Sequence, residues 1–220
     1  MWMELLAMVA GFALLTWSAD RFVAGASALA YNLNISPLII GLTIVSLGTS
    51  APEILVSAVA SLQGNGGLAI GNAIGSNIFN IALIMGVTAV VIPLKIHSGI
   101  VKREIPVLFG VMVLALLLLI DGTLDRRDGI ILLTGMVLML VWMARVGIRE
   151  KSSRDPMGEE FADEVPTDMG MLPAALWTLV GGLALLASSK ILVWGAVSIA
   201  HMMGISDLVI GLTIVALGTS

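Results

Sequence analysis

The chain has 220 residues, of which 58% are hydrophobic and 12% charged, and its formal net charge is −4. Soluble proteins carry about 25% charged residues, so the composition excludes a soluble globular domain and predicts an all-α polytopic membrane protein. The chain lacks a basic stripe or nucleic-acid motif, which argues against a nucleic-acid partner, and the absence of cysteine excludes disulfides and thiol chemistry.

Apolar runs predict seven helices, at residues 3–30, 36–62, 67–93, 104–121, 128–145, 172–200 and from 206 onward. No Lys or Arg precedes Arg21, so the first run indicates a membrane helix and not a cleaved signal. Residues 146–171 form the only long polar stretch and are expected to link two membrane halves. The expected division is a first repeat at 1–145, this linker, and the start of a second repeat at 172–220.

The basic residues of the loops predict the orientation of these helices. With the N-terminus outside, the cytoplasmic loops hold Lys95, Lys102, Arg103, Arg145, Arg149, Lys151 and Arg154. The outer loops then hold only Arg126 and Arg127. We therefore expect an integral protein of a prokaryotic inner or plasma membrane, with an outer N-terminus and a cytoplasmic 146–171 linker.

One eleven-residue sequence motif, called the phrase below, occurs twice in the chain. Residues 40–50 and 210–220 are identical at ten of eleven positions, and the alignment extends without a gap from 11–50 onto 181–220. Five predicted helices separate the starts of the two copies. Because five is odd, the second copy enters the membrane in the opposite direction, as in inverted-repeat transporters. The expected fold is an inverted-repeat transporter of 5+5 helices, of which about 6.5 lie in this chain.

In the first copy, the repeated phrase leads directly into a proline and a carboxylate. Pro52 lacks an N–H group, so the carbonyl of Gly48 loses its helical partner. Thr49, Ser50 and Glu53 have helical spacing that can place their oxygens on one face. Such oxygen donors suit Na⁺ and Ca²⁺, and an intramembrane carboxylate is a functional candidate by default.

The next helix carries a matching polar face. Ser76 and Asn80 are four residues apart and can point the same way, whereas Asn77 and Asn72 either cap or cross-link helices or act as secondary ligands. Gly71 and Gly75 follow a small-x-x-x-small pattern, which favours tight packing between the second and third helices. Outside this face, Thr43 and Thr213 are expected to bond to their own helix carbonyls.

These motifs resemble the cation/calcium exchanger superfamily, in particular its prokaryotic sodium/calcium antiporters. The family signature pairs Gly-Thr-Ser-x-Pro-Glu on one helix with Gly-Ser-Asn-x-x-Asn on the next, and both occur here at Gly48 to Glu53 and Gly75 to Asn80. The resemblance implies alternating access, in which the helices at 3–30 and 172–200 slide past the core. It also implies a midplane site for the transported Ca²⁺ and Na⁺, with no cofactor.

The resemblance assigns a role to each matching position. It makes Glu53 the central carboxylate for Ca²⁺ and Na⁺, with Asn80 at the centre of the site. The other oxygens are implied to come from Thr49 and Ser50 through hydroxyls and carbonyls, from Ser46 through its carbonyl, from Ser76 at a Na⁺ site, and from Thr219, Ser220 and the Ala216 carbonyl as mirror images.

The family pattern places a second carboxylate three residues after Ser220. With Glu53 alone, bound Ca²⁺ leaves an uncompensated positive charge in a low dielectric. The expectation is therefore that this chain is an inactive fragment of a ten-helix Na⁺/Ca²⁺ antiporter.

Two alternatives stay open at the level of sequence. One is an exchanger of the same fold that is coupled to H⁺ or K⁺, and the other is a cation channel or membrane scaffold. An enzyme is not expected, since the chain shows neither a nucleophile–base pair nor a histidine cluster for a metal. Nothing in the sequence specifies an oligomeric state.

Overall fold

The computed structural model describes residues 2–94, 98–150 and 165–220, and the regular structure within these ranges is helical throughout. The elements are α1 (Trp2–Asn32), α2 (Pro37–Ile40), η1 (Gly41–Val45), α3 (Ser46–Thr49), α4 (Ala51–Leu62), α5 (Gly66–Ile78), η2 (Phe79–Met85), α6 (Gly86–Val91), α7 (Ser98–Leu118), α8 (Arg126–Glu150), α10 (Met171–Met203), α11 (Asp207–Ile210), η3 (Gly211–Val215) and α12 (Ala216–Thr219), where η denotes a π-helix.

Helices occupy each of the seven expected places within the described residues, which confirms the all-α fold. Three of the described spans are long and apolar enough to cross a membrane: Trp2–Asn32, Gly66–Val91 and Met171–Met203. The bent pair Pro37–Thr49 and Ala51–Leu62 forms a fourth. The helix ends differ from the expected ones by a few residues. In particular, α8 continues to Glu150, where a linker was expected from residue 146, and residues 151–164 lie outside the described part.

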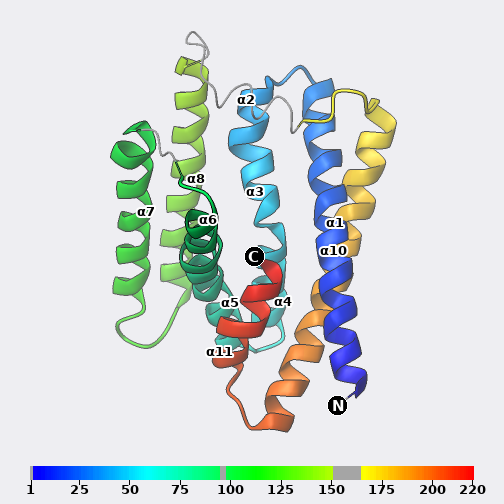
Figure 1. Cartoon of the computed structure of the whole chain (residues 1–220), viewed down its shortest axis with the longest axis vertical. Helices are drawn as coiled ribbons and strands as arrows, with labels where there is room; N and C mark the ends of the chain where they lie inside the picture. Colours follow the sequence, from blue (N-terminus) through cyan, green and yellow to red (C-terminus); the bar gives the residue numbers. More distant parts are fainter. Residues whose placement is uncertain (1, 95–97, 151–164) are drawn as a thin grey trace.

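The two leading helices, α1 and α10, lie side by side and run in opposite directions (Figure 1). A Cβ added at Gly11 would lie 3.1 Å from the Leu192 backbone, and one at Gly181 would lie 2.6 Å from the Phe22 backbone. The repeat relates these two contacts to each other, because Gly181 is the equivalent of Gly11 and Leu192 is the equivalent of Phe22. The glycines thus bring the backbones together about a local two-fold axis, as small residues do between membrane helices.

The same symmetry holds further along the pair. Gly25 lies against the backbone near Thr178, and its equivalent Gly195 lies against Met8, which is the equivalent of Thr178. Added Cβ atoms would lie 2.5 Å from Thr178 N and 3.2 Å from Met8 N. The weak sequence match over this first helix therefore corresponds to a real structural repeat.

Both leading helices end in the same left-handed turn. Asn34 and its equivalent Gly204 each have φ of 64°. The residue that follows each of them donates its N–H to the carbonyl five residues back, at 3.1 and 2.9 Å. This is the pattern of a Schellman C-cap, for which glycine or asparagine is preferred.

The second helix of each copy then leaves the turn from opposite ends of the bundle (Figure 1). In the first copy the helix begins at Pro37, and in the second at Asp207, where Ser206 accepts a hydrogen bond from Val209 N at 3.4 Å. The two copies of the phrase therefore run antiparallel, as the odd helix count predicts.

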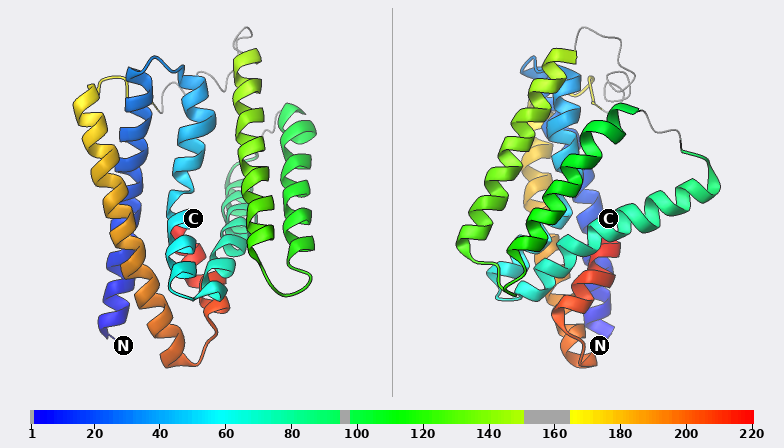
Figure 2. Two further views of the ribbon diagram at one scale, coloured as in Figure 1. Left: turned by 180° about the vertical axis from the view of Figure 1, so that it is seen from behind. Right: turned by 90° about the vertical axis from the view of Figure 1, so that its left-hand side faces the viewer.

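The remaining helices complete the bundle. The span α5–η2–α6 runs obliquely to its neighbours (Figure 2), and α8 packs against α2 and η1. The largest buried cluster lies where α1, α10, α4, α5 and η3 meet, with Leu15, Val56, Leu68, Leu192 and Val215 almost inaccessible to solvent. The cluster includes Ala51, the first residue of α4, and so reaches the point where the second helix breaks.

Candidate cation site

The second helix breaks within the repeated phrase. Its halves, Pro37–Thr49 and Ala51–Leu62, are bent by 44° at Ser50, whose φ and ψ of −90° and 6° are not helical. Pro52 lies in the first turn of α4, where its missing N–H is tolerated. The break predicted from Pro52 is confirmed, and it exposes helix-end backbone groups at the level of Glu53.

Glu53 stands in the first turn of α4, where the helix dipole favours a negative charge. The residue is half-buried, and its Oε2 atom is enclosed without a hydrogen-bond partner among the described residues. A carboxylate oxygen in this state costs free energy until it meets a cation or a donor. It therefore provides an open ligand position.

The second copy of the phrase ends beside this position. The segment α11–η3–α12 packs along α5, and its end lies next to the junction of α3 and α4 (Figure 1). The Thr219 hydroxyl donates to Asn72 Oδ1 at 3.2 Å, and Asn72 in turn donates to the backbone carbonyl of Glu53. The end of the second copy thus lies beside the helix break that follows the first copy.

Asn72 joins these elements from α5. It is fully buried, and its Nδ2 donates to the Glu53 carbonyl at 3.1 Å and to Ser57 Oγ at 3.0 Å. Its Oδ1 accepts from Thr219 Oγ1 at 3.2 Å. Of the two structural roles considered for Asn72, the cross-link is the one observed.

Ser57 is a packing contact that was not expected from the sequence: its Oγ accepts from Asn72 Nδ2 and donates to the Ala69 carbonyl at 3.4 Å, which holds α4 against α5. It lies four residues after Glu53 on α4, so helical spacing could have placed it on the same face. What could not be read from the sequence was its partner on α5.

The hydroxyls of the first copy bond within their own helix. Thr49 Oγ1 donates to the Ser46 carbonyl at 3.1 Å, and Ser46 Oγ donates to the Gly41 carbonyl at 2.8 Å. Ser50 is exposed and does not cap α4 with its hydroxyl. The lone pairs of Thr49 and Ser50 thus remain available at the break.

The second copy repeats part of this pattern. The Ala216 carbonyl accepts from Thr219 Oγ1 at 3.4 Å and from Ser220 N at 3.0 Å. Ala216 is buried and Ser220 exposed. The Ala216 carbonyl therefore takes the place that the Ser46 carbonyl has in the first copy.

The third helix brings only part of its polar face to the site. Ser76 is buried and donates to the Asn72 carbonyl at 2.8 Å, so it adjoins the cross-link. Asn77 is exposed and donates to the Ala73 carbonyl at 2.9 Å, and Asn80 is exposed at the start of η2. The structure does not bring Asn77 or Asn80 to Glu53.

The prediction that Gly71 and Gly75 of α5 pack against the second helix was wrong. An added Cβ at Gly75 would lie 2.5 Å from the Leu212 carbonyl oxygen and the Ala216 Cβ, and Gly71 lies against Leu208 and Leu212. The glycine face of α5 thus packs on the second copy, whereas α5 contacts α4 through other residues. The spacing of the glycines identified a face suited to close packing, but it did not identify the helix that packs there.

Both copies contain a π-helical turn over the same five residues, Gly-Leu-Thr-Ile-Val. Thr43 and Thr213 donate to carbonyls four residues back at 2.5 and 2.7 Å, which confirms their expected bonding. Because π-turns are frequent at functional sites, their presence just before both half-sites supports a functional role for the phrase.

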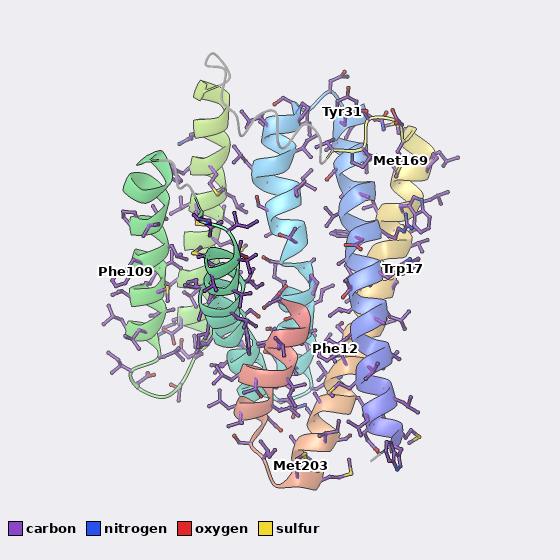
Figure 3. The ribbon with its side chains drawn as sticks, in the orientation of Figure 1. Phe12, Trp17, Tyr31, Phe109, Met169 and Met203 are labelled. Atoms are coloured by element: carbon purple, nitrogen blue, oxygen red, sulfur yellow. The ribbon has the colours of Figure 1, made fainter. Side chains whose placement is uncertain are left out.

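Helix α1 touches both copies one residue before their Thr-Ser pairs. Val23 contacts Gly48 in the first copy, and Phe12, labelled in Figure 3, contacts Gly218 in the second. Side chains at these glycines would meet α1 directly. The leading helix therefore packs against each half of the site.

Comparison with known proteins identifies the class to which this arrangement belongs. The family model described as sodium/calcium exchanger protein matches residues 3–145 and 173–220. The chain belongs to this family, which confirms the resemblance seen in its motifs.

Several relatives extend the comparison. The chain is 51% identical to the putative antiporter CaxA of Alkalimonas amylolytica and 42% identical to the inner membrane protein YrbG of Escherichia coli. Each match covers 97% of this chain and 66% of the relative, so the chain spans about two thirds of the length of these curated relatives.

A solved structure is similar as well. The sodium-calcium exchanger NCX_Mj, soaked with Na⁺ and Ca²⁺, matches with a TM-score of 0.57 at 32% identity, covering 99% of this chain and 68% of that one. The helical architecture described above therefore resembles that of this exchanger over the matched residues.

Proposed function

We propose that this chain forms part of a secondary antiporter that exchanges Na⁺ for Ca²⁺ by alternating access at a midplane site. The observation that carries the proposal is the hydrogen bond between Thr219, from the second copy, and Asn72, which also bonds to the Glu53 carbonyl at the helix break after the first copy. Inverted-repeat transporters bind their ions at such a repeat interface, where helices are broken.

The chemistry of the donors supports cations of this type. Glu53 supplies a carboxylate, Thr49, Ser50 and Thr219 supply hydroxyls, and the break supplies carbonyls. These are hard oxygen ligands, which suit Na⁺ and Ca²⁺. Among the described residues no Lys or Arg forms an ion pair with Glu53, so its charge is left for a transported cation.

The roles of Ser46, Ser76, Asn80, Ser220 and Ala216 as ligands belong to the same proposal. Ser76 adjoins the site through Asn72, and the Ser46 and Ala216 carbonyls occupy equivalent places in the two copies. Asn80 is exposed in this structure, so its role requires a rearrangement of α5 or of η2.

The leading pair provides the moving part in this proposal. Helices α1 and α10 are held together by backbone contacts at glycines, and α1 touches both half-sites through Val23 and Phe12. A shift of the pair along its axis would change both contacts together. This supports a sliding motion as the source of alternating access.

The test uses the full-length protein in proteoliposomes. An outward-directed Na⁺ gradient is expected to drive uptake of radiolabelled Ca²⁺, and dissipating the gradient with a Na⁺ ionophore is expected to abolish it. Uptake that ignores the Na⁺ gradient but follows a pH or K⁺ gradient would assign the coupling to H⁺ or K⁺. Downhill Ca²⁺ flux that needs no counter-ion would indicate a channel.

A further inference from the structure

Asn72 bonds through its side chain to α4, the helix that follows the first copy of the phrase, and to α12, which ends the second copy. Its carboxamide reaches the Glu53 carbonyl and Ser57 Oγ on α4, and Thr219 Oγ1 on α12. It is wholly enclosed. A buried amide on α5 with two partners on α4 and one on α12 is fixed in position.

The bonding partners determine which way the amide faces. A backbone carbonyl only accepts hydrogen bonds, so the NH₂ group must face Glu53 and the Oδ1 atom must face Thr219. Both N–H donors are then used on α4. The Thr219 hydroxyl is consequently the donor in its bond with Asn72.

Thr219 has one hydroxyl proton and more than one possible acceptor. Asn72 Oδ1 lies at 3.2 Å and the Ala216 carbonyl at 3.4 Å, and Glu53 stands on the neighbouring α4, where Asn72 bonds to its backbone carbonyl. If the proton points to Glu53, it lies where a cation would bind. If it points to Asn72, the Thr219 lone pairs face the same space as the Glu53 oxygens.

We propose that Asn72 is a positioning residue of the cation site, which accepts the Thr219 proton and thereby turns the Thr219 oxygen toward a cation held by Glu53. This inference rests on the proposed function, since it concerns the same site. It assigns Asn72 no direct contact with the ion. The amide instead directs two oxygen ligands, one from Glu53 and one from Thr219, toward the same cation.

The variant that tests this role is Asn72→Leu in the full-length protein, which keeps the approximate volume and removes all three bonds. Without the acceptor, the Thr219 proton returns to Glu53, and the apparent KM for Ca²⁺ is expected to rise about tenfold, the effect of losing one buried hydrogen bond. Ser57→Ala is the matched control, because it removes one bond of Asn72 but leaves the link to Thr219. Its KM is expected to stay within about twofold of the wild type.

A double-variant cycle separates this role from a merely structural one. If Asn72 acts through Thr219, adding Asn72→Leu to Thr219→Val raises KM by less than about twofold further. Independent, multiplying effects of the two substitutions would overturn the proposal. So would an unchanged KM in a folded Asn72→Leu protein.

Calcium binding in detergent gives a second readout that does not depend on transport. The Ca²⁺ concentration that raises the Tm by half its maximum is expected to rise about tenfold in Asn72→Leu and to stay near the wild type in Ser57→Ala. If Asn72→Leu does not fold, Asn72→Ser replaces it, with the same expected direction. Wild-type Ca²⁺ binding without Na⁺-dependent exchange would contradict the proposed function alone, whereas equal Ca²⁺ affinity in wild type and Asn72 variants would contradict this inference alone.

Discussion

Glu53 is placed where a negative charge is both enclosed and unsatisfied. Its Oε2 atom is buried without a partner among the described residues, and the residue stands at the start of α4 after a 44° bend. Burying a charge is unfavourable unless a counter-charge is supplied. The side chain is therefore suited to a cation that comes and goes.

Replacing Glu53 by Gln is expected to reduce Na⁺-dependent Ca²⁺ uptake by at least about 100-fold, because a neutral amide cannot offset a divalent cation in a low dielectric. Asp20→Asn makes the same chemical change on the exposed face of α1 and serves as the control. Uptake and membrane expression are measured in parallel. Retained exchange in a well-expressed Glu53→Gln protein would remove Glu53 from the site.

Much of the site at this scale was predictable. Pro52 marked the helix break and the repeated phrase marked the two segments that meet near it, because both are local patterns with local physical causes. The bond between Asn72 and Thr219 was not predictable, since it joins residues 147 positions apart in the chain. Only the packing of α12 on α5 brings them together.

At the scale of elements, the contact between α5 and the second copy depends on glycines, which have no side chain to separate the two backbones. Gly71 and Gly75 meet the backbone of α11 and η3, and Gly211 meets the Leu68 backbone from the other side. The glycine spacing correctly predicted close packing but not the neighbouring helix, because a face of small residues can accept the backbone of any helix.

Placing a leucine at Gly75 is expected to lower the free energy of unfolding by about 1–3 kcal/mol, as overpacking does elsewhere. Gly86→Leu is the control on the same span, since a Cβ added there has no atom within 4 Å apart from its chain neighbours and the backbone of its own helix. Its effect is expected to stay within about 1 kcal/mol. Thermal unfolding of the two variants in detergent would measure the difference, and equal stabilities would contradict this packing.

At the scale of the whole molecule, the ends of the helices sort into two sets. The N-terminus, the loop at 119–125 and the turn at 204–206 lie at one end of the bundle, and residues 165–170 lie at the other (Figure 1). The prediction that the N-terminus is outside and the linker cytoplasmic therefore becomes a single question of which end faces the cytoplasm.

These 220 residues contain no cysteine, so a single introduced cysteine can report on that question. Thr123→Cys and Thr167→Cys are matched exposed positions at opposite ends of the bundle. In intact cells, a membrane-impermeant maleimide is expected to label residue 123 and to spare residue 167 until the membrane is permeabilised. The reverse pattern would show that the orientation is inverted.

The paired glycines of α1 and α10 have a consequence for how such a chain could arise. Each of the contacts Gly11–Leu192 and Gly25–Thr178 is matched by a contact between the equivalent residues of the other helix. In the terms used for oligomers, this is an isologous interface, in which one surface meets its own copy about a two-fold axis. One half-length polypeptide inserted in both directions would already possess the face needed to pair with itself, so fusion of two such halves would join an existing dimer.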